Sequence, residues 1–106
     1  MDRGELYWAR LPHPVGRRPV LIVSRSATAT VRAQVTVAPI TRTIRGIRSE
    51  LALGPPHGLR AASVANCDSL QTIPKAVLAA RPIGRLPIPE LIELDRALRY
   101  ALGIRG

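Results

Sequence analysis

Residues 16–24 read GRRPVLIVS, a short apolar run that follows two arginines and a proline. A continuous run of Val, Leu and Ile of this length is typical of a central strand, and proline is tolerated at the first position of a strand. We therefore expect a central β-strand over residues 19–23, beginning at its proline. The segment 12–18 before it is rich in structure breakers and predicts a loop that ends on Arg17 and Arg18.

Further strands are predicted on both sides of this run. Alternating or β-branched apolar residues, separated by Gly and Pro, predict strands at residues 5–11, 34–41, 49–53, 62–66, 68–73 and 81–86. Pro39 lies inside one of them and predicts a bulge or an edge position there. Residues 24–32 are small and polar and predict a loop with one helical turn. Six or seven short strands at regular spacing are typical of a small antiparallel barrel or sandwich.

The C-terminal part changes from alternation to helical spacing. Pro89 suits a first helical turn, Glu90 and Glu93 complement the positive end of a helix dipole, and Gly103 can end the helix. Apolar residues recur there at three- and four-residue steps, namely Leu91, Leu94, Leu98, Ala101 and Leu102. We expect an α-helix over residues 89–102 that packs this stripe on the sheet. The chain is then one domain, 1–106, of the α+β class and mainly β.

Charge is the second informative property of the chain. The 106 residues include 16 cations, 15 of them Arg, against 7 acids, and the net charge is +9. No acid occurs between Glu5 and Glu50, a stretch that holds eight arginines. Because Arg makes bidentate contacts with phosphate, this half predicts a nucleic acid or an acidic protein as partner. A surface that only keeps the protein in solution is the alternative.

Several classes of protein are excluded by what the sequence lacks. Cys67 is alone, so an intramolecular disulfide is impossible, and His13 and His57 match no metal-ligand spacing. No apolar run reaches the ~18 residues of a membrane span, and the N-terminus has no signal-peptide form. We expect a soluble cytoplasmic protein that makes no membrane contact and uses no metal and no cofactor.

The residues also restrict the chemistry. Carboxylates are too few and scattered for a magnesium-dependent nuclease, and no nucleophile-elbow or phosphate-loop glycine pattern occurs. One reaction needs neither metal nor protein nucleophile: the 2′-hydroxyl of RNA attacks the neighbouring phosphodiester and leaves a 2′,3′-cyclic phosphate. An arginine beside a hydroxyl residue can stabilise the charge that develops on phosphorus. Arg18 suits this role because Pro19 holds it in an extended backbone.

Five strings in sequence order resemble the motifs of the MazF/PemK family of toxin endoribonucleases. They cover nearly the whole chain, and their order makes the resemblance specific. The strings are GRRPVLIVS at 16–24, VTVAPITRTIRG at 35–46, SVANCDSLQTI at 63–73, IGRL at 83–86, and the helix that contains LDRAL at 94–98 and ends with LG at 102–103.

The resemblance implies an SH3-like antiparallel β-barrel with a C-terminal α-helix, acting as a homodimer. It implies sequence-selective, metal-independent cleavage of single-stranded RNA, with mRNA as the expected substrate and tRNA or rRNA as alternatives. It also implies a cognate acidic antitoxin, similar to MazE, that holds off growth arrest. Carried onto this sequence, the catalytic arginine is Arg18 and the catalytic threonine is Thr41. The implied RNA contacts are Arg17, Arg42, Arg45, Ser69 and Gln71.

The first loop departs from the family pattern. Relatives often carry a longer loop with a Gly-Ser-Glu-Gln-like string before the Arg-Pro pair, and residues 12–16 lack it. No cleavage sequence is therefore transferred from the family. A guanidinium has a pKa above about 12 and is a poor general base. We assign Arg18 to charge stabilisation and proton donation, and His13 is a candidate for the remaining proton transfer.

Two other functions fit the same fold. One is a toxin that inhibits DNA gyrase by protein contact, although that branch typically ends in a Trp-containing tail and this chain ends in LGIRG. The other is a non-catalytic RNA-binding barrel. Tyr7 and Trp8 point to opposite faces of a strand, so one packs inside and the other is free to stack a base or line a dimer contact. Cys67 is expected to fill the core, His57 to have no chemical role, and Tyr100 to pack or contact a partner.

Overall fold

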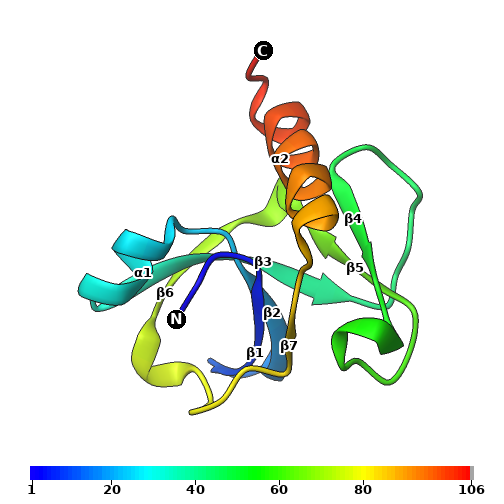
Figure 1. The fold of residues 1–106 in the computed structure, drawn as a ribbon. Helices are drawn as coiled ribbons and strands as arrows, with labels where there is room; N and C mark the ends of the chain where they lie inside the picture. Colours follow the sequence, from blue (N-terminus) through cyan, green and yellow to red (C-terminus); the bar gives the residue numbers. More distant parts are fainter. Residues whose placement is uncertain (106) are drawn as a thin grey trace.

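Short strands form one curled antiparallel sheet in the computed structural model, which describes residues 1–105 (Figure 1). The seven strands are β1 Glu5–Leu11, β2 Gly16–Ile22, β3 Gln34–Thr41, β4 Glu50–Leu53, β5 Ser63–Asn66, β6 Gln71–Pro74 and β7 Gly84–Arg85. Neighbouring strands run in the order β4-β5-β3-β2-β1-β7, and β6 pairs with β3 outside this path. The predicted class, mainly β with a C-terminal helix, is confirmed, and the sheet curls into a half-barrel.

Two α-helices and three 3₁₀ helices complete the described chain. They are α1 Ser26–Val31, η1 Pro55–His57, η2 Cys67–Ser69, η3 Lys75–Val77 and α2 Ile88–Leu102. In Figure 1, α2 stands at the top against one face of the curled sheet and α1 lies to the left, away from α2; Leu94 of α2 and Ala29 of α1 belong to different cores. The C-terminal helix therefore covers a core of its own, separate from the part of the sheet that α1 covers.

The apolar run of β2 is continuous because both of its faces are buried. Leu21 points toward α2 and shares a core with Leu94, whereas Val20 and Ile22 point to the other face and share a second core with Tyr7. All five side chains are at most 5 % exposed. Side chains alternate between the faces of a strand, so a strand between two cores needs apolar residues at every position.

The helical stripe is mostly confirmed. Leu94 is fully buried, and Leu91, Leu98 and Ala101 pack partly buried against the same core. Leu102 is wrong as a core residue: it is the last residue of α2 and is 57 % exposed, whereas Ala101 beside it packs against the core. The helix ends there on Gly103, whose positive φ of 69° supplies the expected C-cap.

The predicted start of the central strand is wrong. β2 begins at Gly16, not at Pro19, and pairs with β1 from Leu11↔Gly16 to Leu6↔Leu21. Pairing with β3 begins only at Val20. Pro19 is therefore inside the strand but at a point where one edge of β2 is unpaired, and an unpaired edge needs no N–H donor.

Pro39 lies in a central strand, not at an edge or bulge as expected. β3 pairs with β2 on one side, and on the other side it pairs first with β6 up to Val37 and then with β5 from Ile40. The N–H and C=O of Thr36 point toward the β2 side, so alternation directs the nitrogen of Pro39 to the other side. Its missing N–H therefore faces the gap between β6 and β5, where no ladder bond is lost.

Three other segments differ in detail from the prediction. Residues 68–73 are not one strand, because the Asn66 side chain accepts the N–H of Asp68 at 2.9 Å and turns the chain into η2 before β6 starts. Residues 81–86 contain only the two-residue β7. Residues 24–32 contain the six-residue helix α1 in place of one turn. Cys67 fills the core as predicted, and burial raises the pKa of its thiol to about 11.

His57 has a structural role that the sequence analysis did not predict. It is buried, its Nδ1 accepts the N–H of Gly54 at 3.1 Å, and its Nε2 contacts the carboxylate of Glu90 on α2. Because Nδ1 accepts a hydrogen bond, the ring proton lies on Nε2, which donates to the carboxylate of Glu90. The same turn lies so close to β7 that a Cβ on Gly84 would be 2.2 Å from the carbonyl oxygen of His57. These contacts fix residues 54–58 against α2 and β7.

We predict that Gly84→Ala lowers the free energy of unfolding by roughly 3 kcal/mol, because its Cβ would overlap backbone atoms that cannot rotate away. Gly46→Ala is the control: Gly46 has a φ of +71° but no atom within 4 Å of its added Cβ, so only about 1 kcal/mol of backbone strain is expected. Urea unfolding monitored by circular dichroism measures both values. A smaller loss for Gly84→Ala than for Gly46→Ala would contradict the close approach.

Candidate nucleic-acid cleft

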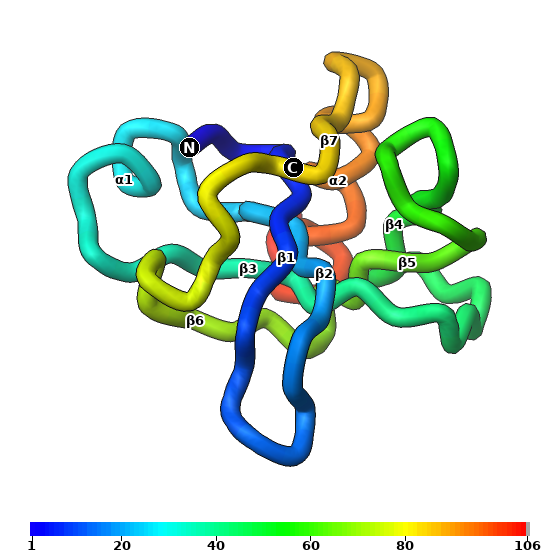
Figure 2. Tube along the Cα trace, turned by 90° about the horizontal axis from the view of Figure 1, so that it is seen from below, coloured from blue at the N-terminus to red at the C-terminus, as the bar shows by residue number. Residues whose placement is uncertain are grey.

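The candidate site lies where β2 and β3 separate. Their last paired residues are Val20 and Pro39. If this register is continued by two residues, Arg18 stands opposite Thr41, but no pairing connects the strands there. β2 instead continues with β1 as a two-stranded hairpin, which projects from the sheet in Figure 2. β3 meanwhile turns to β5 through Thr41↔Val64. The two predicted catalytic residues therefore lie on opposite walls of the same opening.

This opening is a cleft of about 720 Å³. Side chains that the sequence analysis predicted line it on both sides: Arg17 and Arg18 come from β2, Thr41 is the last residue of β3, and Arg42 follows it. A third wall is formed by the segment 58–61, which follows the buried His57. The cleft is open to solvent and of the size that binds small ligands or short stretches of a polymer.

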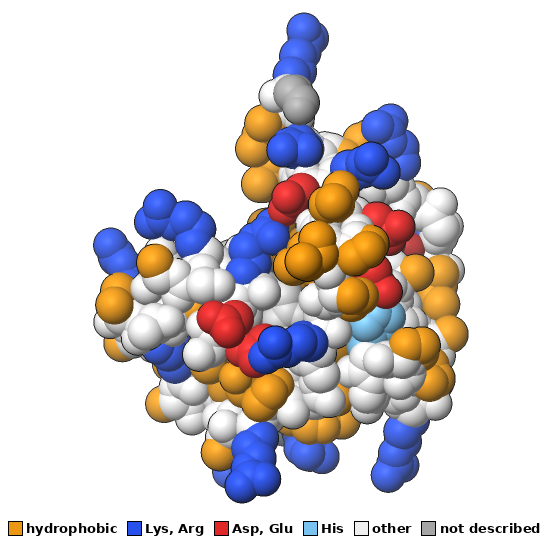
Figure 3. All heavy atoms as spheres, viewed as in Figure 1, with side chains coloured by type: hydrophobic (Ala, Val, Ile, Leu, Met, Phe, Trp, Pro, Cys, Tyr) orange, Lys and Arg blue, Asp and Glu red, His pale blue; other side chains and the backbone are white. Residues whose placement is uncertain are grey.

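Positive charge in the cleft is not neutralised by the protein. Four arginines line it and no carboxylate does. Five of the seven acids are engaged elsewhere, in the pairs or hydrogen bonds Arg3–Asp95, Arg85–Glu5, His57–Glu90, Ser49–Asp68, and Glu50 with the N–H groups of Arg45 and Gly46. In Figure 3 red side chains lie on the face in view with some blue ones beside them, and further blue side chains project from its edges. The cleft therefore attracts an anion.

The hydroxyl of Thr41 is oriented by its own loop. Its Oγ1 accepts the N–H of Thr43 at 3.1 Å, and Thr41 is partly exposed. Because the oxygen already accepts a hydrogen bond, the hydroxyl hydrogen is left to donate into the cleft. A guanidinium and a hydroxyl that face one space are both donors, and together they suit the oxygens of a phosphate.

Trp8 and Arg17 form one wall of the cleft. The guanidinium carbon of Arg17 lies 4.2 Å from the centroid of the Trp8 ring, which is cation–π contact distance. Trp8 and Pro19 are cross-strand partners in the hairpin, so Arg17 reaches Trp8 diagonally on the same face. Of the adjacent aromatics, Tyr7 packs inside and Trp8 stays half-buried at the cleft, as the alternation predicted.

Arg60 is a cleft residue that sequence reasoning missed. It lines the third wall, which the segment 58–61 forms, and it lies outside all of the quoted motifs, a few residues before the one that begins at residue 63. Its position depends on the turn at His57, and Gly58 allows that turn with a φ of +89°, where a Cβ would be 2.5 Å from the carbonyl oxygen of Ile83. The only sequence feature near Arg60 is a Gly-Leu-Arg string after a Pro-Pro turn. This string predicts a turn but does not indicate which way the arginine side chain points.

The structure does not bring every predicted site residue into the cleft. His13 lies in the exposed turn of the hairpin, Arg45 in the exposed loop between β3 and β4, Ser69 in η2 and Gln71 in β6, and none of the four lines the cleft. Their roles in RNA contact or proton transfer stay predictions. They lie outside the cleft because His13 is in the turn of the hairpin, Arg45 is in the loop after β3, and Ser69 and Gln71 lie where β6 begins to pair with β3 at Val37.

Residues 1–105 contain neither a cluster of metal-ligand side chains nor a membrane-spanning helix. No three His, Cys, Asp or Glu side chains gather there in a group that could hold a metal ion. No helix in this range combines the length and the apolar character needed to cross a membrane.

A half-barrel with one C-terminal helix and an arginine-lined cleft defines a small β protein built to bind a polyanion. A family model described as PemK-like, MazF-like toxin of type II toxin-antitoxin systems matches residues 2–102. The chain belongs to this family.

Relatives and solved structures agree with that assignment. The chain is 38% identical over 101 residues to a Mycobacterium tuberculosis protein named probable endoribonuclease MazF5, covering 94% of this chain and 91% of that protein. It is 43% identical over 86 residues to endoribonuclease MazF3 of the same species, covering 81% and 79%. The structure of M. tuberculosis toxin MazF-mt6 matches with a TM-score of 0.88 and 36% identity, over 96% of this chain and 99% of that one. A mycobacterial endoribonuclease solved with its cognate antitoxin matches with a TM-score of 0.85 and 30% identity, over 100% and 98%.

Proposed function

We propose that the protein is an endoribonuclease toxin that cleaves single-stranded RNA at this cleft, with no metal ion. The observation that carries the proposal is that Arg18 and Thr41, which come from separate sequence motifs, line one acid-free cleft. The names of the curated relatives, which are endoribonucleases of the same family, support it. The chemistry of the cleft supports it as well, because all of its charged side chains are cationic.

The proposed reaction uses the RNA as its own nucleophile. The 2′-oxygen attacks the adjacent phosphorus and loses its proton, while the bond from phosphorus to the 5′-oxygen of the next nucleotide breaks and that oxygen gains a proton. The products are a 2′,3′-cyclic phosphate and a 5′-hydroxyl. The protein aligns the backbone and stabilises the charge that builds up on the phosphate oxygens.

Four residues of the cleft have defined roles in the proposed reaction. Arg18 holds the phosphate oxygens and donates the proton to the leaving 5′-oxygen, and Thr41 donates a hydrogen bond to the same phosphate. Arg17 and Arg42 bind flanking phosphates. The lining residues of the cleft include no imidazole and no carboxylate, so the proton of the 2′-hydroxyl passes to water, or to His13 if the hairpin turn bends over the bound RNA.

We expect Arg18→Ala to reduce cleavage of a natural mRNA in EDTA by a hundredfold or more, because removal of one positioned donor to a developing oxyanion typically costs about 10²–10³ in rate. Thr41→Ala should cost about tenfold, corresponding to one hydrogen bond of about 1.4 kcal/mol. Thr41→Ser, which keeps the hydroxyl, should restore the rate. Sequencing of the RNA ends and detection of cyclic phosphate measure the products.

Arg32→Ala is the matched control for these variants, because Arg32 is exposed, carries the same charge and lies outside the cleft. Circular dichroism confirms that each variant is folded. A requirement for added metal, or undiminished cleavage by Arg18→Ala, contradicts the proposal. Inhibition of DNA gyrase without RNA products would favour the gyrase-directed toxin, and RNA binding without cyclic-phosphate ends would favour a non-catalytic barrel.

Arg60→Ala should weaken RNA binding and make it less dependent on salt. Each phosphate contact on a single strand contributes a slope of about 0.7 in log affinity against log salt, so the loss of one contact lowers the slope by that amount. The measurement is fluorescence anisotropy with an oligonucleotide in which all 2′-hydroxyls are absent. An unchanged slope, equal to that of Arg32→Ala, would show that Arg60 makes no phosphate contact.

We also propose that an acidic, flexible segment of a cognate antitoxin covers the same cleft. The four unpaired arginines of the cleft favour it, and a similar structure was solved with its antitoxin. Antitoxin and RNA should then compete, and antitoxin affinity should fall as salt is raised. Competition binding at several salt concentrations tests this, and antitoxin binding that leaves RNA bound would contradict it.

We also propose that the protein is cytoplasmic and acts as a homodimer. The C-terminal end of α2 exposes apolar side chains, with Tyr100 at 52 %, Leu102 at 57 % and Ile104 at 57 %. They adjoin an open groove of about 1000 Å³ that Arg48 and Tyr100 help to line, and Arg48 lies over the Tyr100 ring at 4.5 Å. Exposed apolar side chains grouped next to a groove are typical of a protein interface. The free thiol of Cys67 is compatible with a reducing compartment.

A further inference from the structure

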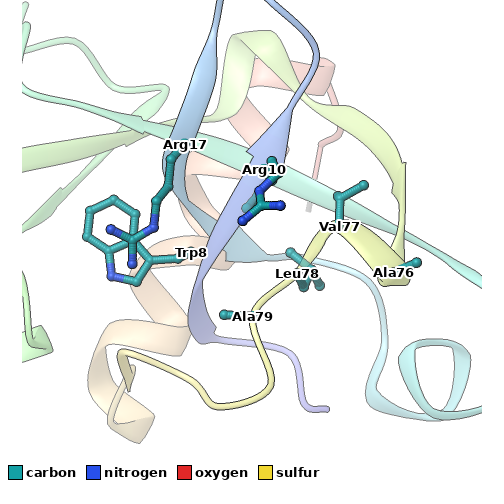
Figure 4. Close-up of a pocket in the computed structure, with 8 residues that line it drawn as sticks. Trp8, Arg10, Arg17, Ala76, Val77, Leu78 and Ala79 are labelled. Atoms are coloured by element: carbon teal, nitrogen blue, oxygen red, sulfur yellow. The ribbon is translucent and has the colours of Figure 1, made fainter.

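A second cavity lies on the other side of the Trp8–Arg17 wall from the cleft. Its volume is about 380 Å³, and its lining combines Trp8, Arg10 and Arg17 of the hairpin with the apolar side chains of Val77 and Leu78. Figure 4 shows the Arg17 guanidinium stacked on the Trp8 ring, with Arg10 between this pair and the residues of η3. The cavity thus has an apolar side and a cationic side.

The apolar side of this cavity is fixed to the sheet. The N–H of Ala79 donates to the carbonyl of Trp8 at 2.9 Å, and Leu78 forms a bridge with Ala9 of β1. Val77 and Leu78 pack partly buried against the core that contains Tyr7. The wall is therefore preformed and is not a loose loop that would close the cavity in solution.

The cationic side holds two like charges in direct opposition. Arg10 and Arg17 are cross-strand partners in the hairpin, and like charges in this position repel each other. Among residues 1–105, no carboxylate forms an ion pair with either of them. An anion bound between the two guanidinium groups would relieve this repulsion.

Trp8 and Arg17 line both the cleft and this cavity. A polymer that enters the cleft therefore meets the second cavity directly beyond their shared wall. A single-stranded nucleic acid suits both sides of the cavity, because its bases pack on aromatic rings and guanidinium planes and its phosphates bind arginines.

We propose that this second cavity is a nucleotide subsite of the RNA-binding surface. One nucleobase next to the cleaved step packs against the Trp8–Arg17 pair and the apolar wall of Val77 and Leu78, and its phosphate lies between Arg10 and Arg17. The inference rests on the proposed function in that RNA must occupy the neighbouring cleft. It assigns Arg10, which was not among the predicted contacts, to RNA binding, and it gives Trp8 the base-stacking role that the sequence analysis left open for one of the two adjacent aromatics.

The test uses Trp8 as its reporter, because it is the only tryptophan in the chain. The probes are single-stranded heptanucleotides without 2′-hydroxyls, which cannot be cleaved by the proposed reaction, and an abasic heptamer with the same phosphates. Base-containing heptamers should quench Trp8 emission, and the abasic heptamer should not. Equal quenching by the abasic heptamer would show that phosphate alone acts there and would overturn the subsite.

Variants separate the two cavities. Arg10 lines only the second cavity and Arg18 only the cleft. Arg10→Ala should weaken heptamer binding about tenfold relative to Arg32→Ala, while Arg18→Ala should retain the quenching. The subsite is overturned if Arg10→Ala binds like Arg32→Ala, if Arg18→Ala alone abolishes the quenching, or if antitoxin quenches Trp8 and the heptamers do not.

Failure of this inference and failure of the proposed function are distinguishable. If cleavage depends on Arg18 but heptamer binding does not depend on Arg10, the subsite is rejected and the proposed nuclease activity stands. If heptamer binding depends on Arg10 but no RNA is cleaved, the nucleotide subsite stands and the proposed nuclease activity is rejected.

Discussion

The rest of the site depends on where the pairing of β2 with β3 stops. Past Val20 and Pro39 the two strands separate, since β2 continues with β1 as a hairpin and β3 turns to β5. A sheet paired to its end would have filled this space with ladder hydrogen bonds, and Arg18 would be an ordinary cross-strand neighbour of Thr41. Separation instead leaves a cleft between them. Prolines stand beside the separation on both strands, where an N–H donor is not needed.

The second constraint is electrostatic. Within residues 1–105, arginines gather around the cleft and the hairpin without acidic partners, while five of the seven acids bind partners elsewhere. This arrangement costs stability, because like charges are held together, and it is tolerated because the segments that carry them are anchored by other contacts. His57 and Glu90 fix the turn before Arg60, and Ala79 fixes η3 to β1. The protein is thus a rigid scaffold with an unsatisfied positive surface, which is the condition for binding an anion.

Much of this was predictable, and the exceptions have physical causes. Arg18 and Thr41 could be found because each belongs to a local string, and α2 could be found because its apolar spacing is local as well. Arg60, Arg10 and the Trp8–Arg17 stack could not, because their roles depend on which segments meet in space. The position of Pro39 was misread for the same reason: proline argues against a central strand only if the N–H would have been used, and here β3 changes partner at that residue.

The sequence by itself determined most of the strands though not all of their ends, the terminal helix, the family and the surplus of arginine, because these depend on side-chain periodicity, short motifs and composition. Only the tertiary structure decided which arginines share a cleft, which side chains of the hairpin face a second cavity, and that His57 holds a wall in place. A residue's type and its neighbours along the chain set its local conformation. The charge and the donors that converge on one point in space are set by the register of strands distant in sequence, and no local pattern encodes where that pairing ends.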